Sequence, residues 1–440
     1  MNKLGWKMGK VAGVLAVVGL LAASCANNST TTPPPGATTS GSATSGSAAS
    51  APGVTPTAVV TGAISTLSGP IAANFKSFVP GVQAYFDMVN AAGGINGRKL
   101  LLPYNLDDGG NPSQFAQLSH TLINQDHVFA VAGVATAFFQ PGYFASTGTP
   151  TYGYSVTGNW SGPSNLYAAG GSLQYVPGLV PFVAYAANQV HAKSIAILSY
   201  NIPASSAACQ ATENGLKAAG YNVSYVDLNV AYGTPLTSDV QRMQQAGSDF
   251  VLSCMDVTGN ISMARAIQQY GLKIHQLWLD GNDQSVLNSY SNLMQGVYFL
   301  ISHVPFTAPT KYYPGLAQYL AAMNKYEPKY TYDEVAIQGW ESAVLFAAGV
   351  KAAGSDLTQQ RVVALTNQMT DFTANGLTPP TNWENAHTRY VPPSCEGYIQ
   401  VQGTRYVSVF APGHQVFFCF DPNSVKHPTP VTPPAGTPGA

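Results

Sequence analysis

Residues 80–108 read PGVQAYFDMVNAAGGINGRKLLLPYNLDD, and this stretch decides the fold. In its first half the apolar side chains recur at the spacing of one buried helical face, namely Val82, Tyr85, Phe86 and Val89. Gly93-Gly94 follows, and glycine is typical of the position just after a helix. Asn96-Gly97 then marks a tight turn. The stretch therefore predicts a helix over residues 80–92 and a strand over residues 99–104.

The same alternation continues outward from this stretch. A β-rich run, residues 58–64, precedes it. Further strands are expected at 129–134, 194–198, 222–228, 249–253 and 276–279, and further helices at 113–125, 204–219, 238–246 and 261–270. This spacing is typical of parallel βαβ units with helices on both faces of a sheet. Ligands bind beyond the carboxyl ends of such strands, so the loops of interest are 66–75, 135–139, 152–160, 200–206, 254–260 and 280–283.

Two such blocks occur in series, at about 58–171 and 172–300. A late helix over residues 333–353 follows, in which we expect Trp340 to be a core residue. Residues 395–420 contain two β-rich runs around Gly403, which predict a hairpin stapled by its cysteines. The sequence thus predicts the α/β class.

The composition argues against a nucleic-acid partner. Only 9% of the 440 residues are charged, against roughly 25% in an ordinary soluble protein. The 19 basic and 20 acidic residues leave a net charge of −1. Binding to phosphates requires a clustered basic surface, which this balance does not favour. The hydrophobic fraction of 45% is sufficient for sizeable cores, so the chain as a whole is not disordered.

The first residues indicate secretion. Lys3, Lys7 and Lys10 precede an uncharged run over residues 11–23, which is the order of a signal peptide. A helix that spans a bilayer needs roughly 20 residues, so this run is too short for one. Small residues stand directly before Cys25 and resemble a bacterial lipobox, which predicts a signal peptide over 1–24 and a lipidated Cys25. An ordinary signal peptide with a chance cysteine is the alternative. Two acyl chains would hold the protein on the outer face of the cell membrane.

Two segments have the composition of disordered chain. Residues 26–57 contain no charge and are almost entirely Ser, Thr, Gly, Ala and Pro. Such a segment cannot bury enough apolar surface to offset its ordering entropy. We therefore expect a flexible lipid-anchored linker over 25–57 and, for the same reason, a disordered tail over 421–440.

Four further cysteines remain in an oxidising compartment, namely Cys209, Cys254, Cys395 and Cys419. They allow three pairings, of which sequence neighbourhood favours Cys209 with Cys254 and Cys395 with Cys419. A metal site is not favoured, because no CxxC occurs and the histidines are scattered singly.

Residues 81–100, with Asp107-Asp108 after them, resemble the hallmark of the branched-chain amino-acid (Leu/Ile/Val) binding protein family. Leu67-Ser68-Gly69-Pro70 and Gly133-Val134-Ala135-Thr136 resemble it as well. The resemblance implies the type I periplasmic-binding-protein fold, with two lobes joined by three crossings around a cleft. It divides the body into four segments. The first lobe begins with residues 58–171 and the second lobe follows with residues 172–302; the chain then returns to the first lobe over 303–388 and to the second over 389–420.

The resemblance also implies site residues. Thr136, next to Ala135, lies where the family holds the α-carboxylate of its ligand, and Ser155 and Thr157 lie where that site is completed. Asp280 lies where the family places the acid that pairs with the α-ammonium. One carboxylate neutralises an ammonium, so Asp280 suits this role. The alternative is that these are turn residues, as Ser, Thr and Asp-Gly often are.

Other positions depart from the family pattern. Asp256 stands where the family has a wall of tyrosines and adds a second acid near Asp280, which suggests a ligand with more positive charge, a ligand with more polar groups, or a bound water. Asn74 and Phe75 replace an expected aromatic residue in the first lobe. Tyr154 and Tyr200 are candidates for an alternative aromatic wall. Branched-chain specificity is therefore not expected.

Three classes of function are compared. A lipid-anchored solute-binding subunit is favoured, with a small solute such as an amino acid or related amine and an ABC importer permease as partners. A ligand-sensing receptor domain without transport is the alternative, although no signalling segment follows the body. An extracellular enzyme is least expected, because no P-loop, GxSxG or HExxH occurs. We expect a monomer with no cofactor, no metal, no nucleic acid and no enzymatic activity.

Overall fold

The first β-sheet contains the strand predicted within residues 80–108 and four strands from outside that stretch. In the computed structural model its strands are β1 (Ala58–Ser65), β2 (Lys99–Asp107), β3 (Ala130–Ala135), β4 (Thr151–Gly153) and β5 (Leu166–Ala168). Their order across the sheet is β2-β1-β3-β4-β5, and every neighbouring pair is parallel. All six residues of β3 are buried, as expected for an inner strand covered on both faces.

The structure describes residues 51–172, 179–389, 393–411 and 413–439. The expected signal peptide and Cys25 lie outside these residues. Only the end of the expected linker is described, and there Val54 forms an isolated antiparallel bridge with Val59 of β1. The described residues belong to one compact unit, residues 49–440.

The second sheet contains eight strands. They are β6 (Ile195–Tyr200), β7 (Val223–Val230), β8 (Phe250–Cys254), β9 (His275–Trp278), β10 (Tyr298–Ile301), β11 (Ser394–Gln402), β12 (Arg405–Ser408) and β13 (Phe417–Phe420). The order is β12-β11-β10-β9-β8-β6-β7, and β13 also pairs with β11. The strands from β7 to β10 are parallel, whereas β11 is antiparallel to each of its partners.

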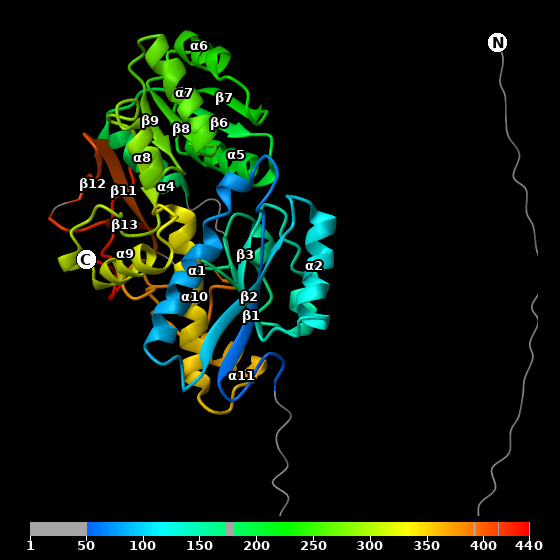
Figure 1. Cartoon of the computed structure of the whole chain (residues 1–440). Coiled ribbons are helices and arrows are strands. Elements are labelled where there is room, and N and C mark those ends of the chain that lie inside the picture. The colour runs from blue at the N-terminus through cyan, green and yellow to red at the C-terminus, as the bar shows by residue number, and fades with distance from the viewer. Residues whose placement is uncertain (1–50, 173–178, 390–392, 412, 440) are drawn as a thin grey trace, which may run out of the picture. The chain divides into compact units, whose positions relative to one another are not determined.

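Helices cover both sheets (Figure 1). Those before β6 are α1 (Phe78–Ala91), α2 (Pro112–Asn124), α3 (Gly142–Thr147) and α4 (Leu179–Gln189). Those that follow are α5 (Pro203–Ala218), α6 (Thr237–Gln245), α7 (Val257–Gln269), α8 (Gln284–Tyr290), α9 (Pro314–Tyr326), α10 (Glu334–Ala353) and α11 (Gln359–Thr366). The prediction of an α/β fold with two blocks of parallel strands and helices is confirmed.

The chain passes between the two sheets three times. It leaves the first sheet after β5 and enters the second at β6. After β10 it returns to the first, where α10 packs on α1 and contacts β3 and β4. It then rejoins the second sheet at β11. Helices from the two ends of the sequence thus share one layer (Figure 1).

Two glycines allow α1 and α10 to touch along their backbones. A Cβ on Gly81 of α1 would lie 1.9 Å from the carbonyl oxygen of Ala336, and a Cβ on Gly339 of α10 would lie 2.0 Å from that of Phe78. A larger residue at either position would force the helices apart. Trp340, beside this contact, is fully buried and packs edge-on against Tyr85, as a core residue should. The contact fixes the beginning of α10, which faces the candidate site.

The carboxyl-terminal part differs in two respects from expectation. The two runs around Gly403 are β11 and β12, but the disulfide Cys395–Cys419 joins β11 to β13, the strand on its other side. The expected disordered tail makes ordered contacts, because Val431 forms a bridge with Cys419 and Pro434 reaches the candidate site. Proline-rich composition hides such contacts, since they need no regular secondary structure.

The helices were also searched for a membrane span. Within the described ranges, no helix is both long enough and apolar enough to cross a bilayer.

Candidate ligand-binding site

Loops from both sheets enclose a cavity of about 670 Å³. The first sheet contributes residues within 71–77, 137, 154–156 and 169–171, and the second contributes residues within 200–208, 254–257, 279–283 and 302–303. The beginning of α10 and residues within 378–389 and 393–396 complete the wall. Each loop singled out from the sequence supplies at least one lining residue. The cavity therefore lies at the carboxyl ends of the strands, where open parallel sheets bind ligands.

Most of the expected site residues line this cavity, namely Asn74, Phe75, Tyr154, Ser155, Tyr200, Asp256 and Asp280. Ala135, Thr136 and Thr157 are not among the lining residues. Ala135 is the buried last residue of β3, and the hydroxyl of Thr157 is buried without a hydrogen-bond partner among the described residues.

Thr136 belongs instead to a buried network that joins three strand ends. Its hydroxyl is hydrogen bonded to that of Thr66 at 3.1 Å and accepts the backbone N–H of Phe138 at 3.1 Å. Thr66 in turn donates to the carboxylate of Asp108 at 2.7 Å. These residues directly follow β1, β2 and β3, so the network fixes the edge from which the first-sheet loops extend.

Asp256 holds several groups together. It is the N-cap of α7 and accepts the backbone N–H of Gly259 at 3.1 Å, in the role that Asp favours at a helix start. It also accepts the phenol of Tyr200 at 2.7 Å and the side-chain amide of Asn74 at 3.1 Å. Asn74 lies in a loop of the first sheet, so this contact bridges the cavity. The carboxylate of Asp256 is therefore already occupied by donors of the protein.

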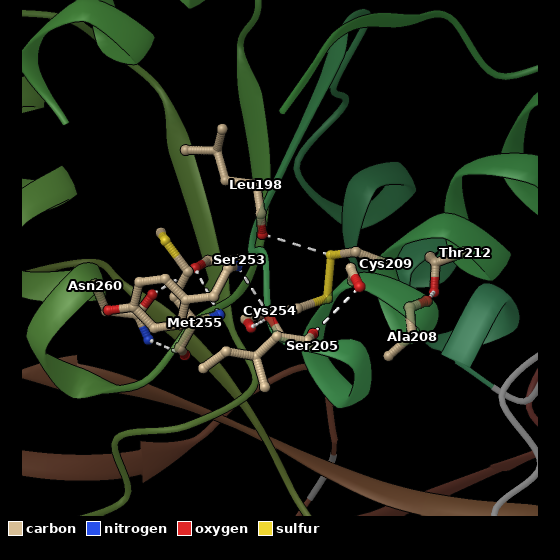
Figure 2. The surroundings of a disulfide bond; sticks show 12 residues. Leu198, Ser205, Ala208, Cys209, Thr212, Ser253, Cys254, Met255 and Asn260 are labelled. Atoms are coloured by element: carbon tan, nitrogen blue, oxygen red, sulfur yellow. Dashed lines mark hydrogen bonds between the residues drawn. A yellow bond between two sulfur atoms is a disulfide. The ribbon is translucent and has the colours of Figure 1, made fainter. Parts of the chain in front are cut away.

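A fully buried amide braces the loop of Asp256 against that of Asp280. Asn260 donates to the backbone carbonyls of Met255 at 3.1 Å and of Asp280 at 3.2 Å. Its own oxygen accepts the hydroxyl of Ser253 at 2.6 Å. Figure 2 shows Ser253, Met255 and Asn260 in the surroundings of the disulfide bond. The sequence analysis missed this residue, since a lone Asn within a helix carries no distinctive pattern.

A disulfide reinforces the same loop. Cys209 of α5 is bonded to Cys254, the last residue of β8 and two residues before Asp256 (Figure 2). Ser205 donates to the carbonyl of Cys254 and accepts the backbone N–H of Tyr200 at 3.0 Å. With the second bridge, Cys395–Cys419, the pairing favoured by sequence neighbourhood is confirmed. Cys254 and Cys395 both line the cavity.

Asp280 differs from Asp256 in having an open carboxyl group. It follows β9 and lines the cavity, and no described side chain donates a hydrogen bond to it. Burial, with the nearby charges of Asp256, Asp283 and Asp333, raises the pKa of Asp280 to about 7. A cationic partner would remove that penalty, because it favours the ionised form.

Two further open carboxyl groups were missed by the sequence analysis. Glu334 is the first residue of α10, just after its N-cap Asp333, and Glu396 lies in β11 beside Cys395. Both line the cavity. Burial and the charges of Asp280 and Glu396 hold the pKa of Glu334 well above its usual value, and burial raises that of Glu396 to about 8. The low proportion of charged residues could have pointed to these two acids, because each acidic residue is informative in a chain with so few charges.

Polar side chains in the wall also lack partners. Both amide atoms of Asn282, the oxygen of Gln338 and the hydroxyl of Thr378 are buried without a hydrogen bond among the described residues. All three residues line the cavity, with 1%, 7% and 3% of their surfaces exposed. Buried polar groups are normally hydrogen bonded, so unmet capacity facing a cavity points to a ligand.

Aromatic rings form part of the wall. Phe75 and Tyr154 pack edge-on with their ring centroids 6.0 Å apart, and the ring centroids of Tyr200 and Tyr232 are 5.3 Å apart. Burial and the charges of Asp280, Glu334 and Asp333 raise the pKa of Tyr154 well above its usual value. Tyr154 therefore stays neutral at physiological pH.

Glu341 links two of the passages between the sheets. Its carboxylate accepts the backbone N–H of Gly170 at 2.8 Å and lies 3.9 Å from the imidazole of His303. Burial raises the pKa of Glu341 to about 7 and lowers that of His303 to about 3. The imidazole is therefore neutral and this is not an ion pair at neutral pH.

The cavity as a whole has an acidic lining. Its carboxyl groups are those of Asp256, Asp280, Asp283, Asp333, Glu334, Glu341 and Glu396. Among the described lining residues, the only Lys or Arg is Arg389, which is exposed. Nowhere in the described part of the chain do three His, Cys, Asp or Glu residues converge as metal ligands would.

Comparison with known sequences gives two matches. A profile of the family described as periplasmic binding protein matches residues 58–394. The Leu/Ile/Val-binding protein homolog 3 of Brucella melitensis biotype 1 is 31% identical over 83 residues, which are 19% of this chain and 22% of that protein. The matched region thus spans about a fifth of the length of this curated relative.

Solved structures share the fold. A fatty acid ABC transporter substrate-binding protein from Thermomonospora curvata has a TM-score of 0.70 and 18% identity, with 82% of this chain and 93% of that chain covered. A branched chain amino acid ABC transporter from Thermus thermophilus with bound valine has a TM-score of 0.68 and 16% identity, with 81% and 96% covered. An ABC transporter solute binding protein from R. palustris in complex with benzoate has a TM-score of 0.64 and 16% identity, with 80% and 95% covered.

Proposed function

Because the chain belongs to the periplasmic binding protein family, we propose that it is the solute-binding protein of an ABC import system and binds a small amine-containing solute, such as an amino acid. Membership of the family implies an extracytoplasmic location. The structural relatives named above are described as proteins of ABC transporters, which supports a permease as the partner.

The observation that carries the amine is the open carboxyl group of Asp280. It faces a cavity with seven carboxyl groups and one exposed arginine among its described lining residues. A charge-assisted hydrogen bond from an ammonium would compensate a carboxylate that burial disfavours. The rings of Tyr154 and Tyr200 add surfaces that favour a cation.

The relatives leave several solutes open, because their descriptions name a fatty acid, benzoate and valine. A fatty acid or benzoate would bring a carboxylate into the acidic cavity, where like charges repel. An amine-bearing solute suits the same lining. This reasoning favours amines over simple carboxylic acids.

Binding is tested by calorimetry and thermal shift with valine, other amino acids, amines, benzoate and a fatty acid. We expect amines to bind and Asp280→Asn to lower their affinity by about tenfold or more, as for loss of a hydrogen bond to a charged group. The exposed Asp371 provides the matched control, Asp371→Asn, which should bind normally. Unchanged amine affinity in Asp280→Asn, or binding of benzoate or the fatty acid alone, would contradict the proposal.

We also propose that Cys25 carries the lipid anchor and that residues 26–57 tether the body to the membrane. A Cys25→Ala variant should appear in the soluble fraction of cells, whereas the unaltered protein stays with membranes. Retention of the variant on membranes would count against the anchor.

A further inference from the structure

Two carboxylate–amide pairs face the cavity from different elements. Asn282 follows Asp280 by two residues on the loop between β9 and α8, and both residues line the cavity. Gln338 follows Glu334 by four residues on α10, a spacing that places both side chains on the same helical face. Each element thus presents one charged and one neutral acceptor together.

The amides in these pairs are built into the wall and yet unsatisfied. Asn282 is 1% exposed and Gln338 is 7% exposed. The oxygen of each has no hydrogen-bond partner among the described residues. An ammonium has three N–H donors and no acceptor, so a carboxylate with an adjacent amide oxygen matches two of its donors.

One positive charge would not balance this arrangement. Asp280, Glu334 and Glu396 are three open carboxyl groups that line the same cavity, and their ionised forms repel one another. An ordinary amino acid brings one ammonium and one carboxylate, so its net charge is zero. Its single ammonium would leave the second pair uncompensated.

On the basis of the function proposed above, we infer that the solute carries two cationic nitrogen groups, one bound by Asp280 with Asn282 and the other by Glu334 with Gln338. Leu279 and Val335, which adjoin the two carboxylates in sequence, also line the cavity and suit an aliphatic connection between the cations. The solute class is an aliphatic diamine or an amino acid with a cationic side chain.

Pairs of ligands that differ by one amine test whether the site binds two cationic groups or only one. We expect cadaverine to bind the full-length protein about tenfold or more tightly than pentylamine, and lysine to exceed norleucine by a similar factor, in calorimetric titrations. Each pair differs by a terminal amine at nearly constant size. Comparison of cadaverine with lysine then shows whether the solute is a diamine or an amino acid.

A variant of the second pair tests the placement. Glu334→Gln should lower the affinity for cadaverine to about that for pentylamine, with pentylamine itself changed by less than about twofold. Asp280→Asn should weaken both ligands. The control is Glu384→Gln, because Glu384 is exposed and outside the cavity lining. Urea unfolding of each variant shows that the fold is kept.

The outcomes also distinguish this inference from the proposed function. If pentylamine and norleucine bind as tightly as their dicationic partners and depend on Asp280, the two-cation inference is overturned and the proposed function stands. If no amine binds, both fail. Tighter binding of magnesium ion alone, with the same dependence on Glu334, would overturn the inference in favour of a metal.

Discussion

Asp256 and Asp280 differ in what already contacts their carboxyl oxygens. Asp256 accepts hydrogen bonds from Asn74, Tyr200 and Gly259, so it contributes to the fold whether or not a solute is bound. Asp280 has no such side-chain donor among the described residues. Two acids that look equivalent in the sequence therefore have different roles.

This difference predicts opposite effects on stability. Asp256→Ala removes a helix cap and two side-chain contacts, so we expect it to lower the free energy of unfolding by about 1–3 kcal/mol. Asp280→Ala removes a carboxylate that its neighbours repel, so the ligand-free protein should be as stable as before or more so. Urea denaturation of the two variants measures this, and equal losses of stability would show that Asp280 also supports the fold.

The sequence predicted part of the candidate site. The pattern of strands marked the loops 254–260 and 280–283, and the family resemblance then pointed to Asp256 and Asp280 within them. Glu334 begins a helix and Glu396 lies within a strand, so neither position suggests a ligand until the third passage brings β11 beside β10. Thr136 was expected at the ligand, but its neighbours Thr66 and Asp108 engage its hydroxyl network, and such contacts are invisible in sequence.

At the scale of elements, the disulfide Cys209–Cys254 ties the middle of α5 to the end of β8 (Figure 2). Asp256 follows directly, and Asn260 couples its loop to that of Asp280. The bridge thus holds a frame from which two acids approach the cavity.

Removal of this bridge should cost stability and binding together. Closing a loop of 45 residues contributes about 4 kcal/mol in the chain-entropy account, so we expect Cys209→Ser with Cys254→Ser to lower the free energy of unfolding by up to that amount. Affinity for an amine should fall as well, because the loop of Asp256 loses a fixed end. Urea unfolding and calorimetry test this, and unchanged values for both would assign the bridge no role in the site.

Most of the expected helices and strands were predicted within a few residues, including the fully buried strands β3 and β6, whereas β4 and α4 were not predicted. The expected helix over 80–92 is α1 (Phe78–Ala91), and the strand expected at 249–253 is β8. β4 has three residues, too few to show a period. α4 is buried around most of its circumference, so its sequence shows no narrow apolar stripe that would reveal a helix.

At the scale of the whole molecule, family and fold were evident from the sequence, because the hallmark stretch carries helix α1 and leads into strand β2 of the first sheet. The family resemblance and the type I architecture are confirmed by the profile match and the shared fold. The cavity chemistry was less evident, since it depends on residues that three passages of the chain bring together.

The acidic cavity predicts that stability and binding respond in opposite directions to pH. Unfolded Asp and Glu titrate near pH 4, whereas burial raises the pKa of Asp280, Asp333 and Glu341 to about 7 and that of Glu396 to about 8. Between these values the folded state binds more protons than the unfolded state. The stability of the ligand-free protein should therefore fall as pH rises from about 5 to 8.

Affinity for a cation should rise over the same interval, because the carboxyl groups must ionise to pair with it. Asp256, Asp283, Tyr154, His303 and Arg389 also face the cavity, and of these the imidazole is already neutral. Thermal unfolding and calorimetry at several pH values check both trends. An affinity that is independent of pH would mean that the open carboxyl groups do not meet the solute.

The hydrogen bond between Asn74 and Asp256 has a kinetic consequence. It joins a loop of the first sheet to a loop of the second. We expect this bond to break when a solute enters or leaves the cavity. The rate at which this hydrogen bond opens would then limit the entry and release of the solute. Solutes of unequal affinity would therefore share one upper limit on their association rate.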